Sequence, residues 1–206
     1  MKKKIILLIG LLFLLCGCSA EVNLEIKDEQ VSETVVIHAY PSGDYTMERL
    51  PGAFLKNVPA YAKDILAEDE GDVRRKGISY YTRTQEEIVN GYKFTYKYNF
   101  KLSNYKDART IKNGFKSSNV YVDKVANTIL FSTDSGGLRY FSDEYPNLDT
   151  VKVNIKTTYK VEEHNADYVN GNVYTWEFRR DNTSKGIYLL LDKTVNGTGE
   201  EKPNDK

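Results

Sequence analysis

Tyr92-Lys-Phe-Thr-Tyr-Lys-Tyr-Asn-Phe100 is the most regular stretch of the chain, and it decides the fold. An aromatic side chain stands at every second position, with lysine, threonine or asparagine between them. Because successive side chains of a β-strand point to opposite faces, this pattern predicts an antiparallel strand with one aromatic and one polar face. Asn90-Gly91 precedes the strand directly and is a hairpin signal. The partner strand is therefore expected within residues 77–89.

The same period of two recurs along much of the chain and predicts further strands. Between them, apolar side chains at helical spacing predict helices over residues 57–66 and 103–114. The sequence therefore predicts one α+β domain, a curved and mainly antiparallel β-sheet with about two helices packed on one face. The further strands are expected at residues 21–27, 31–39, 120–122, 128–132, 151–161, 173–178 and 186–191.

The first eighteen residues have the features of a secretory signal peptide that ends in a lipid-attachment site. Met-Lys-Lys-Lys is followed by an uncharged apolar run at residues 5–15, which is too short to span a bilayer as a helix. Leu15-Cys16-Gly17-Cys18 resembles the lipobox of bacterial lipoprotein precursors. The resemblance implies cleavage before Cys18 and a diacylglyceryl group on its sulfur, with fatty acids such as palmitate as the anchor. An ordinary cleaved signal peptide, or modification of Cys16, is the alternative.

The expected organisation is a removed signal peptide at 1–17, one extracytoplasmic α+β domain at 18–193 and a disordered polar tail at 194–206. The domain would be lipid-anchored to a bacterial cell membrane, and Ser19 with the Lys-, Asn- and Tyr-rich composition favours a Gram-positive cell. No cysteine follows Cys18, so the domain has no disulfides. The 29 basic and 29 acidic residues argue against nucleic acid as a partner, because such binding neutralises phosphates with excess positive charge.

Few residues point to catalysis or to a bound metal. The only histidines, His38 and His164, are expected in a strand and a turn and are too few for a metal site. The acidic run at residues 68–72 lacks the alternating spacing of a calcium loop, so a solvated loop is favoured. Neighbouring carboxylates such as Glu162-Glu163 are a weak signal for a hydrolase, since adjacent side chains usually point apart. We therefore expect no enzyme and no cofactor.

The aromatic strand is the best candidate for ligand binding. Its alternating aromatic face is what a sheet core requires, and the core is the favoured interpretation. The alternative is a curved sheet that leaves an aromatic-lined pocket for an apolar ligand. The residues that would line such a pocket are Tyr92, Phe94, Tyr96, Tyr98, Phe100 and Trp176.

The C-terminal stretch Glu163-His-Asn-Ala-Asp-Tyr-Val-Asn-Gly-Asn-Val-Tyr-Thr-Trp-Glu-Phe178, followed by the apolar strand at 186–191, resembles the end of the LppM-domain family of bacterial surface lipoproteins. The lipobox and the two alternating strands at residues 22–39 resemble its beginning. The resemblance implies a non-enzymatic surface lipoprotein with a curved sheet and helices, and lipid or glycolipid binding in some members. Within the motif, Asn165 and Asp167 are expected in turns, and Asn170-Gly171 suits a type I′ hairpin turn. Many members carry a C-terminal transmembrane helix, which this polar C-terminal stretch does not resemble.

Taken together, the sequence favours a membrane-anchored, non-catalytic binding or scaffolding module of the cell envelope, whose ligand would be lipid, glycan or envelope protein. Two alternatives stay open. The first is a cell-envelope hydrolase that uses carboxylates from separate strands. The second is an adhesive surface protein that binds another protein through an exposed sheet edge.

Overall fold

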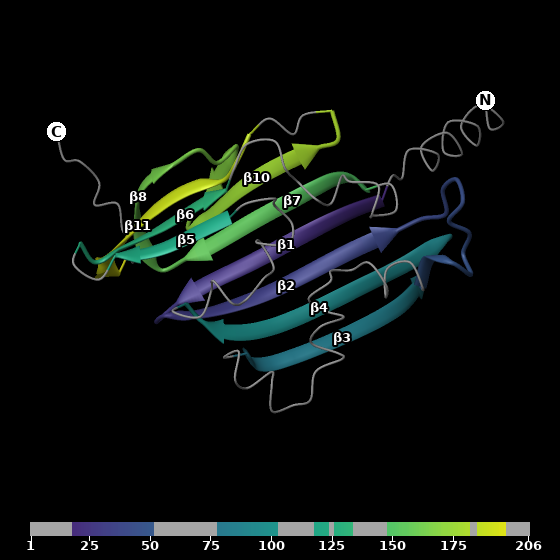
Figure 1. The fold of residues 1–206 in the computed structure, drawn as a ribbon, viewed down its shortest axis with the longest axis horizontal. Helices are drawn as coiled ribbons and strands as arrows, with labels where there is room; N and C mark the ends of the chain where they lie inside the picture. Colours follow the sequence, from purple (N-terminus) through teal and green to yellow (C-terminus); the bar gives the residue numbers. More distant parts are fainter. Residues whose placement is uncertain are drawn as a thin grey trace, which may run out of the picture.

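The computed structural model describes residues 18–51, 78–102, 118–123, 126–133, 148–181 and 185–196, and these ranges form two β-sheets (Figure 1). The expected signal peptide, the helices at 57–66 and 103–114, and most of the expected tail lie outside them. The strands are β1 (Cys18–Lys27), β2 (Gln30–Ala39), β3 (Ile78–Ile88), β4 (Gly91–Lys101), β5 (Ser118–Asp123), β6 (Thr128–Thr133), β7 (Leu148–Thr157), β8 (Tyr159–His164), β9 (Tyr168–Asn170), β10 (Val173–Arg179) and β11 (Tyr188–Asn196).

The larger sheet has seven strands in the order β3-β4-β2-β1-β7-β10-β9, and Figure 1 shows β3 to β10 of this order side by side. The predicted hairpins β1-β2 and β3-β4 are confirmed, and β4 also pairs with β2 along its whole length. β1 pairs with β7 in parallel, which makes the sheet mixed and joins two segments that lie far apart in the chain. The smaller sheet has four strands in the order β5-β6-β11-β8.

The predicted fold class, an α+β domain with two helices on one curved sheet, is wrong for the part of the chain that the structure describes, which is nearly all β. The strand expected at 151–161 is in fact two strands. The chain bends at Thr158, whose N–H donates to the carbonyl oxygen of Ile26, and β8 then enters the smaller sheet. Because both sheets bury their inner faces in one core, the apolar alternation continues unchanged through the bend and conceals it.

One continuous apolar cluster joins the two sheets. In β1, β2 and β7, buried residues alternate with residues that are at least partly exposed and, apart from Val36, polar; β4 buries Phe94, Tyr96 and Phe100, and β10 buries Trp176 and Phe178. The larger sheet therefore has one apolar face in the core and one open polar face. Trp176, Phe94, Phe131 and Phe178 are among the largest fully buried side chains, and they come from both sheets.

Two hairpin turns differ by one residue from the predicted positions. The β3-β4 loop is Val89-Asn90, and Gly91 is already the first residue of β4. Gly91 is needed there because a Cβ atom would lie 2.4 Å from the carbonyl oxygen of Ala39. The β9-β10 loop is Gly171-Asn172, with a φ of 57° at Gly171, which matches a type II′ turn better than the predicted type I′ turn.

The β1-β2 turn, Asp28-Glu29, holds the larger sheet to the smaller one. The N–H of Glu29 donates to the Tyr159 hydroxyl at 3.0 Å, and its carbonyl oxygen accepts from the N–H of Leu102 at 2.8 Å. Its carboxylate pairs with Lys193 of β11 at 2.5 Å. Asp28 and Glu29 both have positive φ angles, 49° and 61°. The tertiary contacts therefore keep Glu29 in a conformation that glycine adopts with less strain.

Replacing Glu29 with glycine is expected to stabilise the protein by about 0.5–1 kcal/mol, because the left-handed backbone is relieved and both main-chain contacts remain. The lost ion pair with Lys193, whose side chain is 16% exposed against 63% for Glu29, offsets part of this gain. Urea denaturation followed by the fluorescence of Trp176, the only tryptophan, measures the change. Glu25→Gly in the middle of β1 is the control and should destabilise the protein. A loss of stability in Glu29→Gly would show that the carboxylate matters more than the backbone.

Candidate functional site

Of the six predicted aromatic pocket residues, four lie in the core of the larger sheet. Phe94, Tyr96, Phe100 and Trp176 are each at most 1% exposed, and Tyr92 is half-buried with its ring centroid 6.1 Å from that of Phe94. Tyr98 lies in β4 opposite Glu33 of β2. Whether these residues only fill the core or also bind an apolar ligand stays a prediction.

Glu33 is a buried carboxyl group that the sequence analysis did not identify. It is only 1% exposed and occupies the apolar face of β2 between Val31 and Val35. The alternation of side-chain direction along the strand could have identified it, because Glu33 stands two residues from each valine and therefore faces the same side of the sheet. Burying a carboxyl group in such a place costs free energy unless it is hydrogen-bonded or paired.

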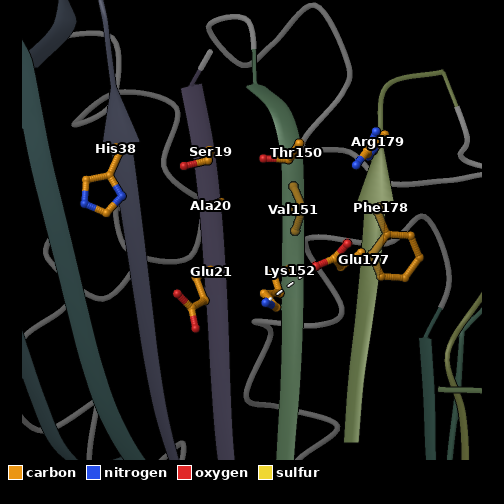
Figure 2. A pocket seen from close by; sticks show the side chains of 10 residues that line it. All are labelled: Ser19, Ala20, Glu21, His38, Thr150, Val151, Lys152, Glu177, Phe178 and Arg179. Carbon is orange, nitrogen blue, oxygen red and sulfur yellow. Dashed lines mark ion pairs between the residues drawn. The ribbon is translucent and has the colours of Figure 1, made fainter. Parts of the chain in front are cut away.

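A polar hollow of about 300 Å³ lies on the open face of the larger sheet (Figure 2). Four neighbouring strands build it, with β2 and β1 on one side and β7 and β10 on the other, and none of the six predicted ligand-binding residues lines it. Its lining residues are Ser19, Ala20, Glu21, His38, Thr150, Val151, Lys152, Glu177, Phe178 and Arg179.

The carboxylates of the hollow are already engaged by neighbouring side chains. Glu177 pairs with Lys152 at 3.5 Å across β10 and β7. Glu21 accepts a hydrogen bond of 2.8 Å from the Nδ2 atom of Asn154, which also donates to Asn23 at 2.8 Å. The Asn154 bonds link β1 to β7 on the polar face, and the Glu177 pair links β10 to β7. Each interaction contributes little free energy in solvent, but together they fix the orientation of both carboxylates.

The hollow brings together groups that the sequence left separate. His38, expected to be an ordinary strand residue, lies on β2 at one side of the hollow near Glu21, whereas Glu177 and Arg179 lie on β10 at the other side, three strands away. The histidine and the two carboxylates do not converge on one point as a hydrolase site requires, and Lys152 and Asn154 already hold both carboxylates. The mixed charges suit the recognition of a small polar group. Within the described ranges, no cluster of three or more acidic, histidine or cysteine side chains could hold a metal ion.

His164 has a structural role at the end of β8. Its Nδ1 atom accepts the N–H of Ala166 at 3.2 Å, and its ring packs edge-on against Tyr174 with centroids 4.9 Å apart. The two histidines are therefore in different environments, and only His38 lines the hollow.

Cys18, the predicted lipidation site, is the first residue of β1 and is 3% exposed. Its Sγ atom accepts the N–H of Tyr40 at 3.2 Å, and the thiol donates to the carbonyl oxygen of Tyr40 at 3.5 Å. Burial raises the pKa of the thiol, which makes the unmodified side chain a poor nucleophile in the folded domain. The pairing of β1 with β7 shifts between Cys18 and Ser19, so regular pairing begins at Ser19.

Asn165 and Asp167, expected to act in local turns, instead connect distant segments of the two sheets. The Oδ1 atom of Asn165 accepts the indole N–H of Trp176 and the backbone N–H of Tyr188, both at 2.7 Å. Its Nδ2 atom donates to the carbonyl oxygen of Gly186 at 2.9 Å. Asp167 accepts the N–H of Glu177 at 2.7 Å and pairs with Lys185. These contacts join the connection between β8 and β9 to both β10 and the start of β11.

Comparison with known proteins gives a fold and no family. No protein-family model matches the chain, and no curated protein matches it. Among solved structures, the folded domain of LppM from Mycobacterium tuberculosis, determined by NMR, has a TM-score of 0.53 at 11% sequence identity, covering 88% of this chain and 94% of that one. The chain therefore has an LppM-like fold. No helix in the described residues is long and apolar enough to cross a membrane.

Proposed function

We propose that this chain is a lipid-anchored protein of the bacterial cell envelope, and that its domain is a binding or scaffolding module without catalytic activity. The observation that carries the proposal is the position of Cys18. The residue that matches the lipobox is also the first residue of β1, at the end of the larger sheet where β2 and β10 end and β4 and β7 begin. An acyl chain can leave from this end once the buried side chain of Cys18 turns outward.

The LppM-like fold is consistent with this proposal, and the state of the polar hollow supports a role in binding. Its two carboxylates are held in place by Lys152 and Asn154, and its charges are balanced, which suits recognition better than proton transfer. Lipid, glycan and envelope protein remain candidate ligands. Native mass spectrometry of the purified protein separates them by the mass of any bound species.

A second candidate, binding of another protein, has one observation in its favour. The edge strand β9 carries Tyr168 and Val169, which are 59% and 48% exposed. An exposed aromatic and an aliphatic side chain on a sheet edge are typical of a site where a partner strand adds. Asp167 restricts the addition of a partner strand, because its carboxylate already accepts the backbone N–H of Glu177 on β10, which a partner strand could otherwise bond.

Metabolic labelling with an alkyne analogue of palmitate tests the anchor. Wild-type protein and the Cys16→Ser variant should be labelled at the size of the mature chain, and Cys18→Ser should lose the label completely. Serine is the matched replacement because its hydroxyl can exchange the same two hydrogen bonds with Tyr40, so the domain should still fold and accumulate. Labelling that persists in Cys18→Ser and disappears in Cys16→Ser would move the anchor and overturn the proposal.

A further inference from the structure

We infer that the Cys18 end of the larger sheet is a membrane-contact surface, which the lipid holds against the bilayer with no linker between anchor and fold. This inference rests on the proposed lipidation of Cys18. It adds an orientation: every strand of the larger sheet except the short β9 stands on the membrane by one end, and the β3-β4 turn touches the lipid.

The absence of a linker follows from strand pairing. Cys18 is already paired with Leu148, and Ser19 pairs with His38 on one side and Thr150 on the other. Each residue of an extended linker would add about 3.3 Å between lipid and domain. Here that distance is limited to the cysteine itself. The end of the sheet therefore cannot move far from the headgroups while the lipid is inserted.

The pairing registers also show which residues lie at the same height above the bilayer. Starting from Ser19, the directly paired residues of successive strands form a row across five strands, which we call the proximal row. With neighbouring strands about 4.8 Å apart, the row is roughly 20 Å wide. Its members are Lys93, His38, Ser19, Thr150 and Arg179.

The β3-β4 turn extends beyond the proximal row by more than the anchor does. Cys18 is one residue beyond Ser19, whereas the Val89-Asn90 turn is three residues beyond the level of Lys93, because Ile88 pairs with Gly91. At about 3.3 Å per residue, the turn reaches several Å closer to the bilayer than the Cα atom of Cys18. Val89 at this turn is 80% exposed, the highest value among the large apolar side chains described. Figure 1 shows this turn and the start of β1 at the same, right-hand end of the sheet.

The chemistry of this end suits shallow contact with a bilayer. Val89 would enter the interface, and the cationic side chains of Lys93 and Arg179 in the proximal row would lie at the level of the lipid phosphates. Acidic Glu86 pairs with Lys93 at 3.5 Å, so this end of the sheet carries charges of both signs. The orientation is therefore set by the anchor and by the shape of the sheet, with electrostatic attraction as a minor contribution.

The surroundings of Cys18 are compatible with a lipid on its sulfur. The unmodified thiol is buried and exchanges two hydrogen bonds with Tyr40, and both are given up when the sulfur carries the lipid. The side chain is buried, so the diacylglyceryl group requires Cys18 to turn outward. The shift in pairing between Cys18 and Ser19 allows this movement without a change in the regular ladder that follows.

Cysteine substitutions in the full-length precursor, labelled with an environment-sensitive fluorophore, test the orientation. A lipidated Cys18 has no free thiol, and Cys16 leaves with the signal peptide, so an introduced cysteine is the only reactive thiol of the mature chain. Val89→Cys places the probe at the Cys18 end, and Asn172→Cys is the matched turn at the other end of the sheet, ten strand residues or about 33 Å away. The purified lipoprotein is reconstituted in phosphatidylcholine–phosphatidylglycerol vesicles that contain a spin-labelled quencher lipid.

We expect the probe at residue 89 to shift to the blue and to lose fluorescence to the quencher, and the probe at residue 172 to do neither. The mass of the protein shows whether it carries the diacylglyceryl group. If lipidated protein is quenched equally at both positions, or more strongly at residue 172, the inference is wrong and the proposed anchor still stands. Protein that lacks the lipid mass and does not enter vesicles would overturn the proposed function, and the inference with it.

Discussion

Replacing Phe94 with alanine is expected to lower the free energy of unfolding by about 3–5 kcal/mol, the cost of removing a large aromatic side chain from a packed core. Phe94 is fully buried, and its backbone pairs with Ile37 on one side and Gln85 on the other, in the middle of the β2-β4-β3 part of the sheet. A cavity at this position would weaken two strand pairs together. Urea denaturation monitored by circular dichroism measures the loss.

Lys97→Ala on the same strand is the matched control. Lys97 is exposed on the polar face, so its truncation should change stability by no more than about 0.5 kcal/mol. The comparison also decides between the two interpretations of the aromatic strand. Suppose that a lipid copurifies with the wild type. If Phe94→Ala is as stable as Lys97→Ala but no longer carries that lipid, the aromatic face lines a ligand pocket. A large loss of stability would show that it is core.

The strands of this protein are predictable because each side chain on them has only two possible directions. Alternation in β1, β2, β4 and β7 separates a buried face from a polar face, and the structure has these strands within a few residues of the expected bounds. The same rule also identifies the one acidic residue on the buried face of β2. Glu33 is at an inward position by period two, and the structure buries it.

Pairing between distant strands is what the sequence could not supply. Nothing local to β1 or β7 indicates that they lie parallel and adjacent, and nothing at Thr158 indicates that the chain passes into a second sheet. An inward-facing residue looks the same whether helices or another sheet cover it. This is why the predicted fold class was wrong for the described residues.

The polar hollow was missed for the same reason. Its charged residues come from four strands, and only the register places His38 level with Arg179. The lipobox differs because its chemistry lies in four consecutive residues and needs no fold to be recognised. The polar hollow and Cys18 of the lipobox lie at the same end of the larger sheet, and local sequence patterns do not indicate that they are neighbours.

Asn165→Ala is expected to destabilise the protein by about 2 kcal/mol, because three hydrogen bonds at the junction of the sheets are lost together. The indole N–H of the fully buried Trp176 and the backbone N–H of Tyr188 would lose their shared acceptor. Partial access of water to the exposed side of Asn165 keeps the cost below the sum of three buried bonds. The free energy of unfolding in urea gives the magnitude, and the emission maximum of Trp176 should shift to the red.

Asn170→Ala, on the exposed strand β9 of the same hairpin, is the control and should leave both stability and emission unchanged within about 0.5 kcal/mol. A double-mutant cycle with Trp176→Phe isolates the bond itself, since phenylalanine keeps most of the buried ring and removes only the donor. A coupling energy of about 1 kcal/mol between the two positions is expected for residues that share a hydrogen bond. Strictly additive effects would mean that the bond between Asn165 and Trp176 contributes nothing of its own, and that Asn165 acts through its bonds to Tyr188 and Gly186.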